Sequence, residues 1–451
     1  MIPLIKSKYT LSLLLLNFYM FGSTAYAYLT PKPHVGPAGI EFQSNVDLDY
    51  GYDDNVNFQS EKTTQVESDF FNVKPFIQLK GVRGADVYTL QYSGDYRQYQ
   101  EETTSDDYDD HTIKFIGAWE KGSNNDLLFT IENKFGHENR GEGLTDGFTT
   151  YDTDTQGENS GSFEKYGIDE VLKTNTFNTS LRYSIDKQDS IGKLSFAVQY
   201  KEFNYDDRPS NTGNVNIDGF NLYIKDQNWD QTTFTLELFD QASSRTRFRY
   251  SIVSNLRNYD ENSLKDTNET FLIAGIKTQQ TGKTTIDANI AWLYKTFPNQ
   301  PNYQEFSGLN WDIDVAWSPV KYSTFHLFTD QNVEDPTEVG GYVLNTTYGT
   351  RWEHFWWSNR LSTNLGFNYK TSADKNKDDD KVTTDTDAII ALKYKFRPSI
   401  LFELSYQQLI SKSNKDSDDF TIPDMKGDFT SVTQQVGYNK SIIMFTTKVQ
   451  I

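Results

Sequence analysis

The stretch that decides the fold is residues 39–53, which read GIEFQSNVDLDYGYD. Every second position from Ile40 to Tyr52 is apolar apart from Ser44, and the positions between them are polar or glycine. Because successive side chains of a strand point to opposite faces, this stretch predicts a long strand with one apolar and one polar face. The same alternation recurs over 309–317 and 361–370 and, less strictly, over 387–396.

Strand length and loop length separate two folds that both suit such strands. A soluble sandwich uses strands of about five or six residues, whereas a membrane barrel needs about 9–11. The alternating segments here run to about a dozen residues, as a membrane barrel requires. Short turns also alternate with long polar connections: the turns are 82–85, 122–125, 187–190, 281–283 and 397–399, and the connections are 55–67, 136–169, 204–228, 257–267 and 371–384. We therefore predict an all-β, transmembrane, antiparallel up-and-down β-barrel with periplasmic turns and extracellular loops.

The alternation predicts about 18 strands, which would return both termini to the periplasm. They are 39–53, 69–80, 86–99, 109–121, 125–136, 170–186, 191–204, 229–241, 245–256, 268–279, 283–295, 306–318, 323–332, 341–354, 360–371, 385–396, 401–412 and 429–451. Two regions leave counts of 16 or 20 open. Phe220, Leu222 and Ile224 also alternate within 204–241, which suits an extra hairpin. The apolar parity changes within 429–451, which suits a bulge near Asn439.

Composition narrows the function classes. The 451 residues include no Cys, which excludes disulfides, thiolate metal sites and a Cys nucleophile. The formal charge of −20 argues against nucleic acid as a partner. Aromatic residues make up 15% of the chain, and five Trp fall at predicted periplasmic strand ends, where barrels carry an aromatic girdle: Trp119, Trp317, Trp352, Trp356 and Trp357.

The N-terminus has the order of a secretory signal. Lys6 and Lys8 precede an apolar run over 11–21, and Ala25-Tyr26-Ala27 is a small-x-small cleavage site. We predict a signal peptide over 1–27, a periplasmic arm over 28–38 and the barrel over 39–451. No later segment contains 18 consecutive apolar residues, so the sequence predicts no transmembrane helix.

The polar parity supplies the candidate functional residues. We expect these charged side chains to face the lumen: Glu41, Asp47, Asp49, Lys74, Arg97, Asp287, Asp312, Asp314, Lys393 and Glu403. They either select the solute or simply face water and pair across strands. Three aromatic residues near the outer strand ends, Tyr99, Tyr205 and Trp229, either stack on sugar rings or pack under loops.

Catalytic and metal motifs are weak. Asp374, Asn376 and Asp378 match the first ligand spacings of a calcium-binding loop, but Asp379 stands where that loop needs glycine. We therefore interpret this segment as a solvated acidic loop. The same interpretation applies to the cluster of Asp416, Asp418 and Asp419. His137 with Asp146 and Ser160 imitates a hydrolytic triad without any sequence motif around it. The sequence therefore predicts no enzyme, no metal and no cofactor.

A resemblance adds to this interpretation. Gly36-Pro37-Ala38-Gly39 leads into the first strand, which ends in Tyr52-Asp53-Asp54-Asn55-Val56. This arrangement resembles the β-barrel porin family that is encoded with bacterial capsule and exopolysaccharide clusters. The final residue, Ile451, departs from the Phe that usually ends outer-membrane barrels. This difference bears on the signal for barrel assembly and not on the fold. Apart from the resemblance, Asp and Asn at 53–55 favour a turn.

The resemblance implies a role in producing or exporting capsular or exopolysaccharide at the outer membrane of a Gram-negative bacterium. Its implied partners are outer-membrane lipid and lipopolysaccharide, with surface polysaccharide and its export machinery. Two other functions remain open from the residues alone: a porin for small solutes, and a structural or adhesive barrel with a closed lumen.

Overall fold

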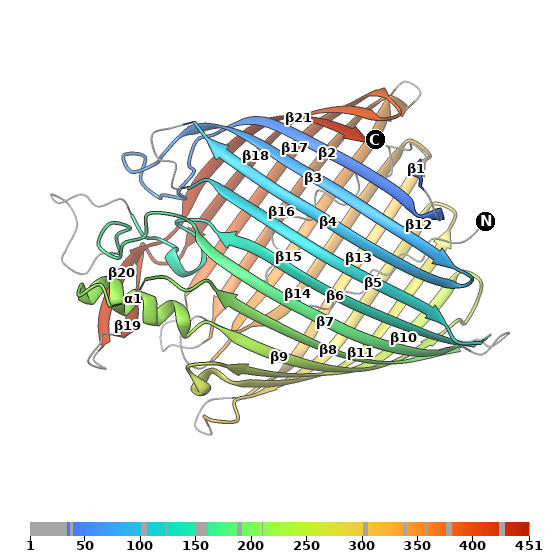
Figure 1. Cartoon of the computed structure of the whole chain (residues 1–451), viewed down its shortest axis with the longest axis horizontal. Coiled ribbons are helices and arrows are strands. Elements are labelled where there is room, and N and C mark those ends of the chain that lie inside the picture. Colours follow the sequence, from blue (N-terminus) through green and yellow to red (C-terminus); the bar gives the residue numbers. More distant parts are fainter. Residues whose placement is uncertain are drawn as a thin grey trace.

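The computed structural model describes residues 34–36, 39–100, 106–122, 124–149, 161–186, 192–209, 211–300, 305–336, 341–356, 359–375, 381–423 and 429–450. Within these residues, 18 antiparallel strands form one closed barrel (Figure 1). The wall closes because β2 (Glu41–Asp53) pairs both with β3 (Ser68–Arg83) and with the last strand, β21 (Tyr438–Gln450). The predicted signal peptide, 1–27, lies outside the described residues.

The other wall strands follow one another in sequence order, each pairing with its predecessor, so the predicted up-and-down barrel is confirmed. They are β4 (Asp86–Tyr99), β5 (Tyr108–Glu120), β6 (Asn125–Glu138), β7 (Leu172–Asp186), β8 (Gly192–Tyr205), β9 (Trp229–Asp240), β10 (Thr246–Tyr259), β11 (Thr267–Thr281), β12 (Thr284–Thr296), β13 (Phe306–Val320), β14 (Ser323–Glu334), β15 (Val343–Trp356), β16 (Leu361–Asp374), β17 (Val382–Arg397) and β18 (Ile400–Ser413). A short strand, β1 (His34–Val35), pairs with the start of β2.

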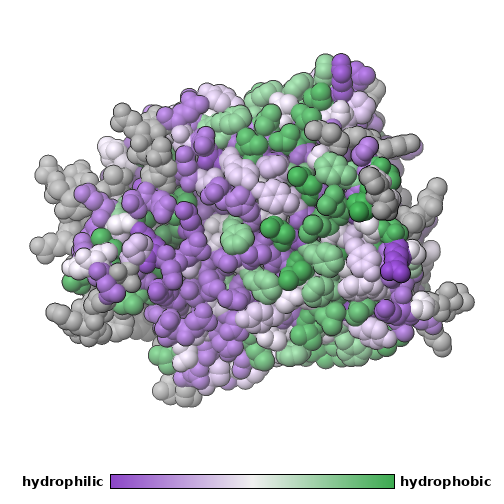
Figure 2. Space-filling model, in the orientation of Figure 1, coloured by the Kyte–Doolittle hydropathy of each residue, from purple (hydrophilic) through white to green (hydrophobic). Residues whose placement is uncertain are grey.

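The two faces of the wall differ as the alternation requires. On β2, Leu48 and Tyr50 are 37% and 50% exposed, whereas Asp49 between them is 2% exposed. Figure 2 shows apolar side chains gathered toward the barrel end that holds the termini, and hydrophilic ones toward the end that holds α1 (Val215–Lys225). The apolar area is the lipid-facing belt of a membrane-spanning barrel, and the alternating polar side chains therefore point inward. We call the end with α1 the outer end.

The last predicted strand, 429–451, is wrong as one element. Its first part is β20 (Phe429–Gln435), which pairs with β19 (Ser417–Pro423) in a separate two-stranded sheet, and only β21 joins the wall. The change of parity marks this break at 436–437, where Gly437 has φ 96°, and it does not mark a bulge. Gly accepts this conformation because it has no Cβ.

The extra hairpin considered within 204–241 is also wrong, because that segment holds the helix α1. Asn214 caps the helix by accepting a hydrogen bond from the Asn216 amide at 3.0 Å. Phe220 and Ile224 lie one helical turn apart and are buried, whereas Leu222 is exposed. The apolar residues 220, 222 and 224 are spaced by two residues, as in a strand. The two that are buried, 220 and 224, are spaced by four, as in a helix. No helix in the described ranges is long and apolar enough to cross a membrane.

Candidate functional site

The outer mouth of the barrel carries a packed cap. We use this name for the described parts of the β6–β7 connection (139–149 and 161–171), α1 and the β19–β20 hairpin (Figure 1). The backbone amide of Gly161 donates to the carbonyl of Thr433 at 2.7 Å, and that of Gln435 donates to Gly147 at 3.1 Å. These bonds join segments that are far apart in sequence into one unit.

The cap has its own apolar core, which reaches down to the wall. Its buried residues are Leu144, Phe148, Phe163, Tyr166, Ile168, Phe220, Tyr223, Ile224, Phe420, Ile422 and Val432, packed with Leu172, Phe203, Tyr205, Trp229 and Tyr259 of the strand ends. Phe203 and Tyr205 alternate with the lipid-facing Phe196 and Val198 of the same strand, so they point inward. The cap therefore extends over the mouth and covers part of it.

A second connection, 54–67, also packs against the inner face of the wall. Val56 is buried with Phe70 and Tyr99, beside Ile442 and Met444. The Asp53 carboxylate accepts a bond from the Asn55 amide at 3.0 Å and pairs with Lys440 at 2.9 Å. The motif at 52–56 thus makes the turn predicted for it. Asn55 also ties this connection to β21, because its side chain donates to the Asn439 carbonyl at 3.0 Å. We call the junction where β2 pairs with β21 and closes the wall the seam.

A third inward element is the end of the β14–β15 hairpin, which we call the inward hairpin end (332–336 and 341–345). β13 pairs with β14 only as far as Trp311 and Gln331, whereas β15 stays paired with β16 up to Val343. The β14 side of the hairpin therefore separates from β13 beyond Gln331, while the β15 side remains in the wall. Val333 shares its parity with Leu327, yet Leu327 is 60% exposed and Val333 is 2% exposed. Val333 packs with Val253, Phe271, Ile273, Ala291 and Leu293, which belong to the inner face of β10–β12.

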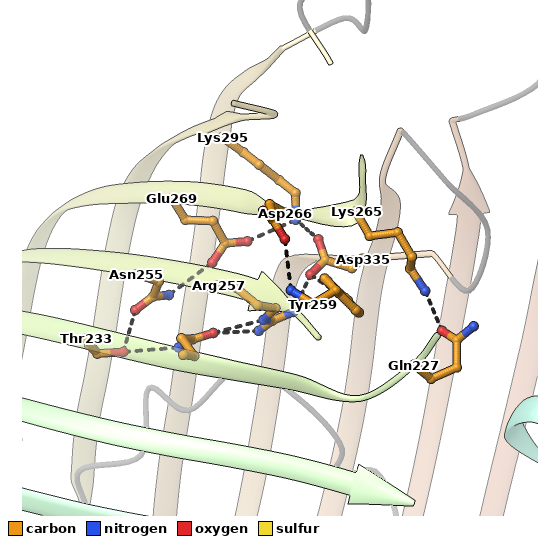
Figure 3. A network of polar contacts seen from close by, with 11 residues as sticks. Gln227, Thr233, Asn255, Arg257, Tyr259, Lys265, Asp266, Glu269, Lys295 and Asp335 are labelled. Carbon is orange, nitrogen blue, oxygen red and sulfur yellow. Dashed lines mark hydrogen bonds and ion pairs between the residues drawn. The ribbon is translucent and has the colours of Figure 1, made fainter. Parts of the chain in front are cut away.

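Buried charged side chains and one tyrosine hydroxyl hold the inward hairpin end in place, and we call them the outer cluster: Arg257, Tyr259, Glu269, Lys295 and Asp335 (Figure 3). Asp335 follows β14 and forms ion pairs with Arg257 of β10 and Lys295 of β12. Lys295 also pairs with Glu269 at 3.0 Å. Burial alone would raise the pKa of Asp335, but the attraction of Lys295 and Arg257 outweighs it and lowers this pKa to about 2.

Near the seam, five predicted lumen-facing residues form the seam cluster together with Asp95 and Lys448, which were not predicted: Asp47, Asp49, Lys74, Lys393 and Glu403. Lys74 lies 3.5 Å from Asp49 and 3.6 Å from Asp95, across β2, β3 and β4. Lys448 joins Asp47 at 3.1 Å to Glu403 at 3.7 Å, and Glu403 lies 3.6 Å from Lys393. Cations and carboxylates therefore alternate around the closing strands. That they select a solute stays a prediction.

The other sequence-predicted candidates lie elsewhere on the wall. Glu41 pairs with Lys80 at 3.3 Å, Asp287 with Lys277 at 2.7 Å, and Asp314 with His326 at 3.3 Å. Asp312 stands opposite Asp330 in the β13–β14 ladder. Arg97 lies over the Phe70 ring at 4.3 Å, beside the packed 54–67 connection.

The aromatic and histidine candidates have structural surroundings. Tyr99, Tyr205 and Trp229 are each less than a tenth exposed and pack in the clusters described above, so they offer no open face to a sugar ring. His137 bonds Asp110 at 2.7 Å and Asn139 at 3.1 Å. Ser160 lies outside the described residues, as do 376–380 of the acidic loop. In the part of the chain that is described, no three His, Asp or Glu side chains are grouped to hold a metal.

Sequence reasoning missed the outer cluster and the inward hairpin end. Their signal is a local loss of alternation, since Phe271, Leu272, Ile273 and Ala274 are apolar on both parities. A strand that is apolar on both faces is covered on both faces. In β11, lipid covers one face, and the inward hairpin end covers the other.

Comparison with known proteins gives the family. The family described as "Putative beta-barrel porin 2" matches residues 33–425. No curated protein sequence matches the chain. Among solved structures, the chain is similar to OpdQ of Pseudomonas aeruginosa, with 9% identity, a TM-score of 0.46, and coverage of 91% of this chain and 97% of that one.

Two further similar structures cover the same share of this chain. The FrpB iron transporter from Neisseria meningitidis has 10% identity and a TM-score of 0.47, with 91% of this chain and 82% of that chain covered. OpdK of Pseudomonas aeruginosa with vanillate has 8% identity and a TM-score of 0.47, with 91% and 99% covered. The family match extends from β1 to beyond β19, through nearly all of the barrel, and the chain therefore belongs to the family "Putative beta-barrel porin 2".

Proposed function

We propose that this protein is a non-enzymatic channel in the outer membrane of a Gram-negative bacterium, and that it passes hydrophilic solutes. The observation that carries the proposal is the charged inner wall, in which ion pairs of the seam cluster link side chains on six neighbouring strands. Such a wall is hydrated at low cost, because its carboxylates and ammonium groups compensate one another's charge. The apolar belt on the other face keeps the barrel in lipid.

The three packed connections support a narrow channel. The cap, the 54–67 connection and the inward hairpin end all contact the inner face near the outer end. An 18-strand wall alone would leave a wide aqueous lumen. We infer that these connections limit passage to small polar solutes in the state described by the structure.

Liposome swelling tests this proposal. Vesicles that contain the purified protein should swell in small neutral sugars such as arabinose and should swell much less in a trisaccharide such as raffinose. Protein-free vesicles, and vesicles that contain heat-denatured protein, are the controls. Absence of swelling in any sugar, with protein of normal heat-modifiable mobility, would reject a channel and favour a closed structural barrel.

A second candidate is a role in capsular or exopolysaccharide production or export. It is favoured by the resemblance at 36–56, where Tyr52 to Val56 form the turn after β2 that bonds to Asn439 and Lys440 of β21. Such a function requires the cap to move, since a glycan needs a wide passage. Its partners would be the polysaccharide, its export machinery and the surrounding lipopolysaccharide.

A clean gene deletion separates the two candidates. Loss of surface polysaccharide with build-up of polymer in the periplasm would support export. Normal surface polymer, together with slower uptake of small sugars, would support the solute channel. Restoring the intact gene on a plasmid should reverse either effect.

A further inference from the structure

The carboxylate of Asp335 sits in a complete set of donors from the wall. Arg257 and Lys295 form ion pairs with it, and the Tyr259 hydroxyl donates to it at 3.4 Å (Figure 3). The side chains of Lys295, Arg257 and Asp335 are 0%, 4% and 7% exposed. An Arg and a Lys that converge on one carboxylate, away from water, are the usual means of binding an anion strongly in a protein.

The donors and the acceptor belong to different kinds of structure. Arg257 and Lys295 lie on strands that are paired along both edges. Arg257 stands opposite Gln231 of β9 and Thr267 of β11, and Lys295 stands opposite Glu269 of β11 and Phe306 of β13. The Arg257 guanidinium is also oriented by Gln231, which accepts its Nε bond at 3.0 Å. Asp335 instead follows β14 at the inward hairpin end, which has left the β13 ladder. The wall therefore supplies a fixed receptor, and a connection supplies its occupant.

The charges explain why the receptor needs an anion. Without Asp335, Lys295 would keep its ion pair with Glu269, and among the contacts drawn in Figure 3 Arg257 would have no carboxylate partner. Lys265 adds positive charge nearby, and burial lowers its pKa to about 8 against the attraction of Asp335. Leaving buried cations without a counter-charge is costly. A second carboxylate has the charge and the geometry to replace Asp335.

We propose that Arg257, Tyr259 and Lys295 form a binding site for the carboxylate of an acidic solute, a site that Asp335 occupies in the resting channel. The inference rests on the proposed channel function and deepens it by naming the solute class. A solute that takes the place of Asp335 also frees the inward hairpin end from its ionic attachment to β10 and β12. The site is therefore a place where solute and channel wall compete for the same cations.

The test uses glucuronate as the probe and Trp229 as the reporter, because the Arg257 guanidinium lies 4.4 Å from the Trp229 ring. Asp335→Asn protein in detergent should bind glucuronate about tenfold more tightly than the unmodified protein, since its receptor lacks a competing charge. Glucose should give no change in fluorescence, and Trp229→Phe protein supplies the background. Asp335→Asn/Arg257→Gln should lose the binding. The matched control is Asp126→Asn, an acid of the wall that pairs with Lys193 outside the outer cluster and should behave as the unmodified protein.

A folded Asp335→Asn protein that responds equally to glucuronate and glucose would overturn the proposal, as would binding that survives Arg257→Gln. If Asp335→Asn does not fold, Asp335→Ala is refolded with acetate or with chloride at equal ionic strength. Recovery in acetate alone supports the site, and failure in both salts overturns it. Binding is measured without flux, so a protein that binds glucuronate but does not swell liposomes would reject the proposed channel and keep the site.

Discussion

Ile313 and Asp312 are neighbours on β13 that point to opposite sides of the wall. Ile313 lies on the same parity as the lipid-facing Leu309 and Trp317, near the middle of the strand. Ile313→Arg should therefore cost about 2–4 kcal/mol of stability, the range for a cation at the centre of the lipid face. Asp312→Asn should be tolerated, because Asp312 stands directly opposite Asp330 and like charges in that position repel. Heat-modifiable gel mobility measures both variants, and equal shifts for the two would contradict this strand register.

Gly51 shows a close approach that only glycine allows. A Cβ at this position would lie 2.5 Å from Cζ of Phe70 and 2.6 Å from the backbone carbonyl oxygen of Ile443. Gly51→Ala should lower the free energy of unfolding by about 1–3 kcal/mol, because the neighbouring backbone has little room to move. Gly81→Ala in β3 is the matched control, since nothing lies within 4 Å of its Cβ position. Urea unfolding in detergent compares them, and equal midpoints would argue against the packing of Phe70 over Gly51.

At the scale of elements, the cap should respond to pH through Asp146. Burial raises the pKa of this carboxyl to about 6, against the attraction of Lys381 and with added repulsion from Asp385, Glu142 and Asp418. The folded cap therefore binds this proton more tightly than an unfolded chain does, whose Asp titrates near pH 4. The stability of the cap should rise as pH falls from about 6 toward 4, and it should be lowest above pH 6.

Limited proteolysis of the cap at about pH 5 and about pH 8, normalised to an unstructured peptide, measures this effect. Asp146→Asn should weaken the pH dependence and protect the cap at the higher pH. Asp416→Asn changes an exposed acid directly before β19, next to the cap, and should leave the dependence as it is. An unchanged pH dependence in Asp146→Asn would show that the carboxyl does not titrate in this range.

The wall elements could be predicted from sequence, whereas the cap could not. Lipid on one side and water on the other impose a period of two, which residues such as Leu48 and Asp49 follow. The cap has no such external solvent boundary, because its residues are buried by segments distant in the chain. Phe220 and Phe420, for example, meet in one core only after the barrel has closed. Asp335 could not be predicted for the same reason, because its partners Arg257 and Lys295 precede it by 78 and 40 residues.

For the whole molecule, the strand count and the closure at β2 and β21 could be read from the alternation of long and short connections. The width of the passage could not, because it depends on which connections fold inward. The structure assigns three such connections, at 54–67, 332–345 and the cap, with the described residues of each packed against the inner face. A channel with a covered outer mouth is the central claim that these contacts support.

Single-channel conductance in planar bilayers tests that claim most directly, with the unmodified protein compared to a variant that lacks the β19–β20 hairpin. Residues 413–436 can be replaced by an Asn-Gly turn, because Ser411 and Tyr438 are already ladder partners on β18 and β21, which places Lys412 opposite Gly437. We expect a small, steady conductance for the unmodified protein and a clearly larger one for the variant, since the cap loses part of its core. No conductance in either protein, or equal conductance in two correctly folded barrels, would contradict the account.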